Sequence, residues 1–142
     1  MMTSNKLDLC VRAYLEYYRS QFKKYGWASD YAEQLIQTDQ KAGLEFVVEL
    51  LNICRNEQEI IFVASGALED FLERYILTHR KEIEKSIRKY PAMRVAIRYV
   101  WTEEESPLQM FLREIELKFT LKNKGAAISF LKDGSNKRSL EE

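Results

Sequence analysis

The sequence predicts an all-α protein, a single compact bundle of about seven helices. Apolar residues recur at steps of three and four along most of the chain, which is the period of an amphipathic helix. Hydrophobic residues make up 46% of the 142 residues and aromatic residues 12%, which is enough for a buried core. The chain has 5 glycines and 2 prolines, too few for the many tight turns of an all-β fold.

The first helix is expected over residues 5–25, where six apolar residues share one face. Ser4 can cap its N-terminus, and Gly26 can end it as a residue in the left-handed conformation. The apolar stripe comprises Leu7, Val11, Tyr14, Tyr18, Phe22 and Tyr25.

Two further helices are predicted between residues 27 and 54. Ser29 can cap the second helix, and either Thr38 or Asp39 can cap the third. The third helix is apolar on more than half of its circumference, so we expect it at the centre of the bundle. The residues of the second helix that we expect to face inward are Tyr31, Leu35 and Ile36, with Trp27 at the corner.

The next helix is capped by Asn56 and interrupted at Ser65 and Gly66. Asn56 and Glu59 have the spacing of a capping box. A glycine inside a helix is unfavourable by about 1 kcal/mol relative to alanine, so Gly66 indicates a close helix approach or a changed backbone direction. The interruption is either a kink or a short break, after which Leu68, Phe71, Leu72, Tyr75 and Ile76 resume the stripe.

Three more helices are predicted in the second half of the chain, and the last of them is expected to end at 124–125. We leave the conformation of residues 126–131 unassigned and expect a polar tail at 133–142, so that residues 1–132 form one helical domain. Helix starts spaced by 17 and 22 residues make an irregular HEAT-like stacking of helical pairs the alternative architecture, although no residue pattern repeats at that period. The starts spaced by 17 and 22 residues are those near Asp39, Asn56 and Thr78. The last three predicted helices begin at Thr78, at Pro91 and at the pair Ser106 and Pro107.

The sequence contains no metal, cofactor or membrane motif. Cys10 and Cys54 lie far apart among apolar neighbours, where a free cysteine acts as a small hydrophobe, and this usage favours a reducing cytoplasm. His79 is the single histidine, and we expect it on the surface at a helix start rather than in a zinc site. The polar N-terminus predicts no signal peptide, and no run of about 18 apolar residues predicts a membrane span. We therefore expect a cytoplasmic protein without cofactor or metal.

Three short segments carry a family resemblance, and the spacers between them are predicted helices. They are Trp27-Ala28, Gly66-Ala67-Leu68-Glu69-Asp70-Phe71-Leu72 and Val100-Trp101. The pattern resembles a bacterial family of small helical domains of unknown function, in which proline usually stands at the place of Ala67. The resemblance covers residues 27–101 and implies an all-helical fold, with a softer helix break here, but no activity. The candidate motif residues are Trp27, Gly66, Leu68, Glu69, Asp70 and Trp101.

Glu69 and Asp70 have two interpretations. They can form an acid–base or metal-binding pair in a helical cleft. Neighbouring residues on a helix point about 100° apart, however, so the two carboxylates converge poorly on one substrate. We favour the second interpretation, in which both lie in the first turn of a helix that restarts after Gly66, where the helix dipole favours carboxylates.

The charges balance at 22 basic and 22 acidic residues, but they are segregated along the chain. Residues 56–77 carry a net charge of −4 and residues 78–99 a net charge of +5. This basic segment is either a solvated face that pairs with the adjacent acidic helix or a docking face for an acidic partner. Nucleic-acid binding through residues 80–98 is disfavoured because the chain is neutral overall and lacks a recognised motif. Four basic residues share one helical face: Lys81, Lys85, Arg88 and Lys89.

The N-terminal third is dense in aromatic residues, and Tyr17 lies to one side of the core stripe. Tyrosine and tryptophan commonly anchor protein interfaces. We therefore expect a non-enzymatic protein-binding module, for example an immunity-type protein that neutralises a bacterial toxin or effector. An enzyme that uses Glu69 or Asp70, and a weak nucleic-acid binder, are the alternatives. No catalytic residue is predicted, and the candidate partner-binding residues are Tyr17, Trp27, Lys81, Lys85, Arg88 and Lys89.

Overall fold

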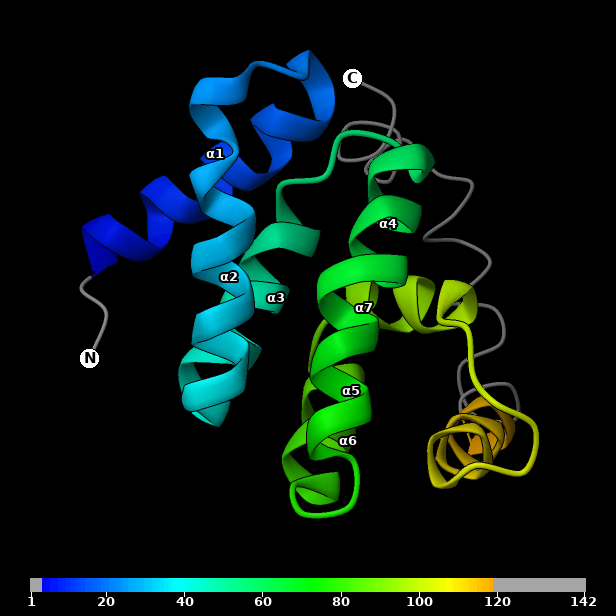
Figure 1. Ribbon diagram of the computed structural model, residues 1–142. Coiled ribbons are helices and arrows are strands. Elements are labelled where there is room, and N and C mark those ends of the chain that lie inside the picture. Colours follow the sequence, from blue (N-terminus) through cyan, green and yellow to red (C-terminus); the bar gives the residue numbers. More distant parts are fainter. Residues whose placement is uncertain (1–3, 119–142) are drawn as a thin grey trace.

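The all-α fold is confirmed in the computed structural model, which describes residues 4–118 and contains no strand within them (Figure 1). Two single 3-10 turns, Lys23–Tyr25 and Ile97–Tyr99, accompany the α-helices, and residues 107–118 are also helical. The expected helix end at 124–125, the unassigned segment 126–131 and the expected tail 133–142 lie outside the described residues. The α-helices are α1 Ser4–Ser20, α2 Trp27–Thr38, α3 Gln40–Asn52, α4 Glu57–Val63, α5 Glu69–Tyr75, α6 Arg80–Lys89 and α7 Pro91–Ala96.

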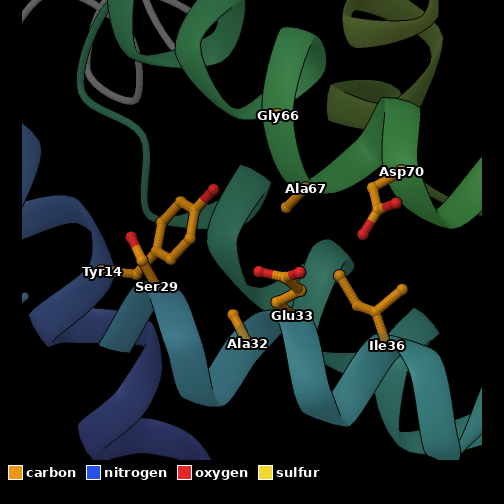
Figure 2. Close-up of a pocket in the computed structure, with 8 residues that line it drawn as sticks. All are labelled: Tyr14, Ser29, Ala32, Glu33, Ile36, Gly66, Ala67 and Asp70. Atoms are coloured by element: carbon orange, nitrogen blue, oxygen red, sulfur yellow. The ribbon is translucent and has the colours of Figure 1, made fainter. Parts of the chain in front are cut away.

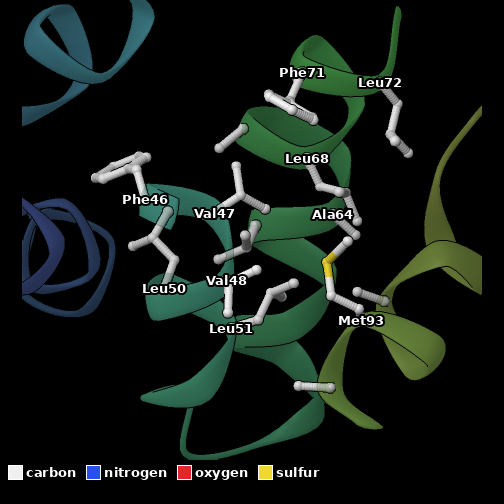
Figure 3. Packing of buried hydrophobic residues seen from close by; sticks show 14 of the residues in the cluster. Phe46, Val47, Val48, Leu50, Leu51, Ala64, Leu68, Phe71, Leu72 and Met93 are labelled. Atoms are coloured by element: carbon white, nitrogen blue, oxygen red, sulfur yellow. The ribbon is translucent and has the colours of Figure 1, made fainter. Parts of the chain in front are cut away.

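Helix α3 lies at the centre of the bundle, as its apolar circumference predicts. It contacts α1, α2, α4, α5 and α7, so the helices surround one core rather than stacking as pairs that touch only their neighbours. Phe46 and Leu50 of α3 are fully buried. Figure 3 shows the α3 side chains facing Leu68 and Phe71 of the next long helix, with Met93 of α7 beside them. Each such buried side chain contributes about 1.5–3 kcal/mol to stability.

The first helix ends earlier than the apolar stripe predicts. Helix α1 stops at Ser20, and Gln21 adopts the left-handed conformation with φ 61°. Gly26, which we expected in that conformation, has φ −62° and precedes α2. The expectation was wrong because Phe22 continues the helical spacing of apolar residues without being buried: it is 59% exposed in the connection. Helix α2 accordingly begins at Trp27, before Ser29.

Three of the predicted helix caps are present, those of Asp39, Asn56 and Ser106. The Asp39 carboxylate accepts a hydrogen bond from the Ala42 amide at 3.1 Å, and Asn56 accepts one from the Glu59 amide at 2.9 Å. The Ser106 hydroxyl accepts a bond from the Gln109 amide at 3.1 Å. Thr78 is not a cap, because α6 begins after His79 and the Thr78 hydroxyl instead contacts the His79 ring nitrogen at 2.8 Å.

Glu59 is the single buried charged residue among those described, with 3% of its surface exposed. Arg19 donates to its two carboxylate oxygens, from Nε at 2.6 Å and from Nη2 at 2.9 Å. The Arg55 backbone amide donates to the same carboxylate at 2.8 Å. Burial raises the pKa of Glu59, but these hydrogen bonds outweigh it and hold the pKa below its ordinary value. The ion pair thus joins the end of α1 to the start of α4.

Ser65 and Gly66 do not break the helix that contains them. Helix α4, a π-helical turn over Ala64–Leu68 and α5 form one continuous helix over residues 57–75. Gly66 has no positive φ; instead, a Cβ atom on it would lie 3.2 Å from the Tyr14 hydroxyl. The close-approach interpretation of Gly66 therefore fits. The expected helix restart was wrong, so Glu69 and Asp70 do not lie at a helix N-terminus.

Replacing Arg19 by methionine is expected to lower the free energy of unfolding by about 3 kcal/mol, because the buried Glu59 would lose its bidentate partner and keep only the longer 3.7 Å ion pair with Arg55. Since the folded-state pKa of Glu59 is depressed, the stabilisation is present above its unfolded-state pKa and is lost as the pH falls through the folded-state value. Urea denaturation at several pH values measures both effects. The control is Arg12→Met, which removes an exposed pair with Asp8 and should cost about 0–1 kcal/mol. Equal losses at neutral pH would contradict the prediction.

Gly66→Leu is expected to destabilise the fold by about 1–3 kcal/mol, because its side chain would run into Tyr14. Gly66→Ala has two opposite effects on stability. Its higher helix propensity stabilises the helix by about 1 kcal/mol, whereas the tight contact of its Cβ atom with the Tyr14 hydroxyl is unfavourable. Alanine should therefore stabilise a Tyr14→Phe background more than it stabilises the parent. Denaturation of the four proteins of this double-mutant cycle measures the coupling, and strictly additive effects would count against the contact.

Candidate functional site

A cavity of about 320 Å³ lies between α1, α2 and the 57–75 helix (Figure 2). Helix α2 contributes four residues whose spacing places them on one face, and the 57–75 helix contributes three around its π turn. Turns of this kind occur often at functional sites. The lining residues are Tyr14, Ser29, Ala32, Glu33, Ile36, Gly66, Ala67 and Asp70.

Tyr14 forms the floor of this pocket. Its side chain is 8% exposed, and its ring packs edge to face on Phe46 with 5.7 Å between centroids. Burial raises the pKa of the phenol to about 12; the charge of Asp70 acts in the same direction, and a hydrogen bond from the Ala67 amide opposes it. The hydroxyl therefore stays protonated at neutral pH.

The rim of the pocket is acidic. Asp70 is half-buried and Glu33 is exposed, and both carboxylates point into the space between the helices (Figure 2). Within residues 4–118 neither takes part in an ion pair, and Glu33 accepts only a 3.4 Å hydrogen bond from the Gln37 amide. The lining contains no lysine, arginine or histidine. The lining therefore carries two carboxylates and no basic side chain.

The candidate motif residues divide between the pocket and the scaffold. Gly66 and Asp70 line the pocket, and Leu68 is fully buried in the core. The Glu69 carboxylate accepts a 3.1 Å hydrogen bond from the backbone amide of Trp101, whose side chain is 65% exposed. Glu69 thus holds the segment that follows α7, while Asp70 faces the pocket, so the structure does not bring the two carboxylates to one site.

The chain matches a known protein family over most of its length. A family model, described as a family of unknown function (DUF6869), matches residues 17–113, which is more than half of the chain. The chain belongs to this family. The matched range contains all three resembling segments, and it contains every pocket residue except Tyr14. No curated protein and no solved structure matches the chain.

Within the range that this family model matches, Tyr17 and Trp27 are brought to the same end of α2. Trp27 is 40% exposed and packs edge to face on Tyr31, with 6.2 Å between ring centroids. The Tyr17 ring lies 3.8 Å from the place where Gly26 would carry a Cβ atom. Since Trp27 and Ser29 are two residues apart, they point to nearly opposite sides of α2. Trp27 and Tyr31 thus lie on a different side of α2 from the pocket. We call Tyr17, Trp27 and Tyr31 the aromatic surface.

Within the described residues, the basic residues of α6 do not pair with the acidic 57–75 helix as one of the two expectations had it. Lys81, Lys85, Arg88 and Lys89 are exposed, opposite the buried Ile83 and Ile87. Arg88 and Lys118 pair with Glu84 at 2.8 and 3.1 Å, and Arg80 pairs with Glu114. These partners lie on α6 itself and on the helix at 107–118, not on the acidic 57–75 helix. Lys81 and Lys85 form no ion pair within the described part of the chain.

The two cysteines are buried and free. Burial raises the pKa of Cys10 to about 11 and that of Cys54 to about 12, so both remain thiols, as small hydrophobes do. His79 is half-buried at the start of α6, and its ring packs edge to face on Tyr75. None of the helices formed by residues 4–118 has the length and apolar character needed to cross a membrane.

The sequence did not reveal the pocket residues Tyr14, Ser29 and Glu33 as a group. Tyr14 belongs to a core stripe, while Ser29 and Glu33 are polar residues four apart on a surface helix, a spacing that many exposed helix faces share. Gly66 was a residue in the sequence that pointed to this region. It predicts that another side chain approaches the helix backbone closely, but not which side chain does so.

Changing Lys81, Lys85, Arg88 and Lys89 together to glutamine is expected to change the free energy of unfolding by about 1 kcal/mol or less, because exposed ion pairs contribute little. Arg94→Gln is the contrasting variant. It removes a guanidinium that donates to the Ile87 and Arg88 carbonyls at 3.0 and 2.6 Å, so a larger loss is expected. Thermal and urea denaturation compare them. If the quadruple variant lost more stability than Arg94→Gln, the description of an exposed face would be wrong.

Proposed function

We propose that this protein is a non-enzymatic protein-binding module whose partner docks on the aromatic surface of Tyr17, Trp27 and Tyr31. The observation that carries the proposal is Trp27, which is 40% exposed yet held edge-on by Tyr31. A large ring that is already fixed loses little side-chain entropy when a partner covers it. Tryptophan and tyrosine are also the residues that most often dominate binding energy at interfaces. Phe22, 59% exposed in the connection before α2, adds further apolar surface.

The two alternative functions have less support. An enzyme that used Glu69 and Asp70 as a pair would need both carboxylates at one site, whereas Glu69 is bound to the Trp101 amide and Asp70 faces the pocket. A nucleic-acid binder would need a continuous basic face. Here Glu84 lies within that face, and Arg94 is directed to backbone carbonyls at the end of α6.

Within the class of binding modules, we favour a bacterial cytoplasmic protein of the immunity type, which masks a toxin or effector. The exposed Lys81 and Lys85 support an acidic partner, because charge attraction accelerates the encounter of complementary proteins. The quadruple glutamine variant should therefore associate more slowly and with a weaker dependence on salt. Association kinetics at low and moderate ionic strength measure this, and an unchanged rate would exclude α6 from the encounter.

Trp27→Ala is expected to weaken partner binding by at least about 2 kcal/mol, the scale of an interface hot spot. Affinity purification from the native cells, with quantitative mass spectrometry, identifies stoichiometric partners of the parent, and titration calorimetry measures the purified pair. Trp101→Ala is the matched control, since it removes the same side chain at 65% exposure on another segment. A partner that is lost with Trp101→Ala but retained with Trp27→Ala would place the interface elsewhere.

A further inference from the structure

Two carboxylates share the pocket without a cation between them. Asp70 and Glu33 approach from facing helices, and both are directed into the cavity (Figure 2). Neither forms an ion pair within residues 4–118, and no basic side chain lines the cavity. Charge-assisted hydrogen bonds to carboxylates are among the strongest polar contacts in proteins, so a cation placed here would be held from two sides.

The Tyr14 hydroxyl, at the floor of the same pocket, uses only part of its hydrogen-bonding capacity. Tyr14 is 8% exposed, and its oxygen accepts a hydrogen bond from the Ala67 amide. Within residues 4–118, no hydrogen bond has the Tyr14 O–H as its donor. The hydrogen is therefore left to solvent in the pocket, and an occupant that offers an acceptor at this point would take the place of that solvent.

The remaining walls suit a short alkyl group. Ala32 and Ile36 are buried at 2% and 1% exposure, and Gly66 contributes no side chain. The volume of about 320 Å³ is at the lower end of the range for small-molecule pockets. Because Ser29 and Glu33 are exposed, they form the entrance, while Tyr14 and Ala67 form the buried end.

We propose that this pocket binds a small organic cation: a primary ammonium group held by Asp70 and Glu33, with a neighbouring hydrogen-bond acceptor that receives the Tyr14 hydroxyl. The N-terminus of a peptide and small amino-acid amides have this chemistry. A metal ion fits less well, because the described residues contain no group of three or more metal-ligating side chains. The proposal does not depend on the aromatic surface, which lies on another side of α2.

The test titrates L-alaninamide into the ¹⁵N-labelled full chain and follows the backbone amides of residues 66–70. We expect saturable shifts, with the Ala67 amide among them and a Kd on the order of 1 mM for so small a ligand. Propanamide has no ammonium group and should produce no shifts. Propylamine has no acceptor and should bind more weakly than alaninamide.

Variants test which residues bind the ammonium group of the ligand and which residue binds its hydrogen-bond acceptor. Asp70→Asn and Glu33→Gln should each weaken alaninamide binding about tenfold or more, because each removes a charged acceptor. Asp30→Asn is the matched control, since Asp30 is an exposed carboxylate on α2 outside the lining, and it should leave the Kd within about twofold. Tyr14→Phe should weaken alaninamide binding but leave propylamine binding unchanged.

Four outcomes would overturn the proposal. Absence of shifts at residues 66–70 up to the solubility limit would mean that the pocket takes no amine. Equal binding of propanamide would show that the ammonium group is not recognised. An equal loss with Asp30→Asn would reduce the effect to general surface charge. Tighter binding of Mg²⁺ to the same amides, tested alone, would make the pocket a metal site instead. Each outcome leaves the Trp27 comparison intact, so failure here is distinct from failure of the proposed protein-binding function.

Discussion

The ion pair between Arg19 and Glu59 sets the arrangement on which the pocket depends. It joins the end of α1 to the first turn of the 57–75 helix, and Arg19 also donates to the Ile53 carbonyl at the end of α3. Tyr14 lies five residues before Arg19, and Gly66 lies seven residues after Glu59. The same two helices therefore touch at two points, one charged and one steric. These two contacts fix the angle at which α1 crosses the 57–75 helix. They thereby also fix the position of the Tyr14 hydroxyl in the pocket.

Gly66 and the π turn make the second of these contacts possible. The missing Cβ atom lets the Tyr14 oxygen approach the backbone, and the Ala67 amide bonds to that oxygen in return. The segment that follows serves the core through Leu68, the link to Trp101 through Glu69 and the pocket through Asp70. One short motif thus combines packing, chain positioning and site chemistry, and a substitution within it affects more than one of them.

The fold class and the caps at Asp39, Asn56 and Ser106 could be predicted because each depends on residues a few positions apart. The helix end at Gly26 was wrong because apolar spacing continues through a connection whose Phe22 is exposed. The role of Glu59 was missed for the opposite reason: its partner, Arg19, lies 40 residues away. The pocket likewise requires knowing which helices meet, and periodicity along one helix does not contain that information.

The two proposed surfaces lie on different sides of α2, and the packing of α2 decides whether they can influence each other. The buried face of α2 consists of Ala28, Ala32 and Ile36, of which the last two also line the pocket. It rests on α3 so closely that a Cβ atom on Gly43 would lie 3.2 Å from the Ile36 Cα. A helix seated this tightly does not rotate or shift without clashes, because a close-packed core resists small displacements. Ligand binding at Asp70 and Glu33 should therefore leave Trp27 and Tyr31 in place, and the two sites should bind independently.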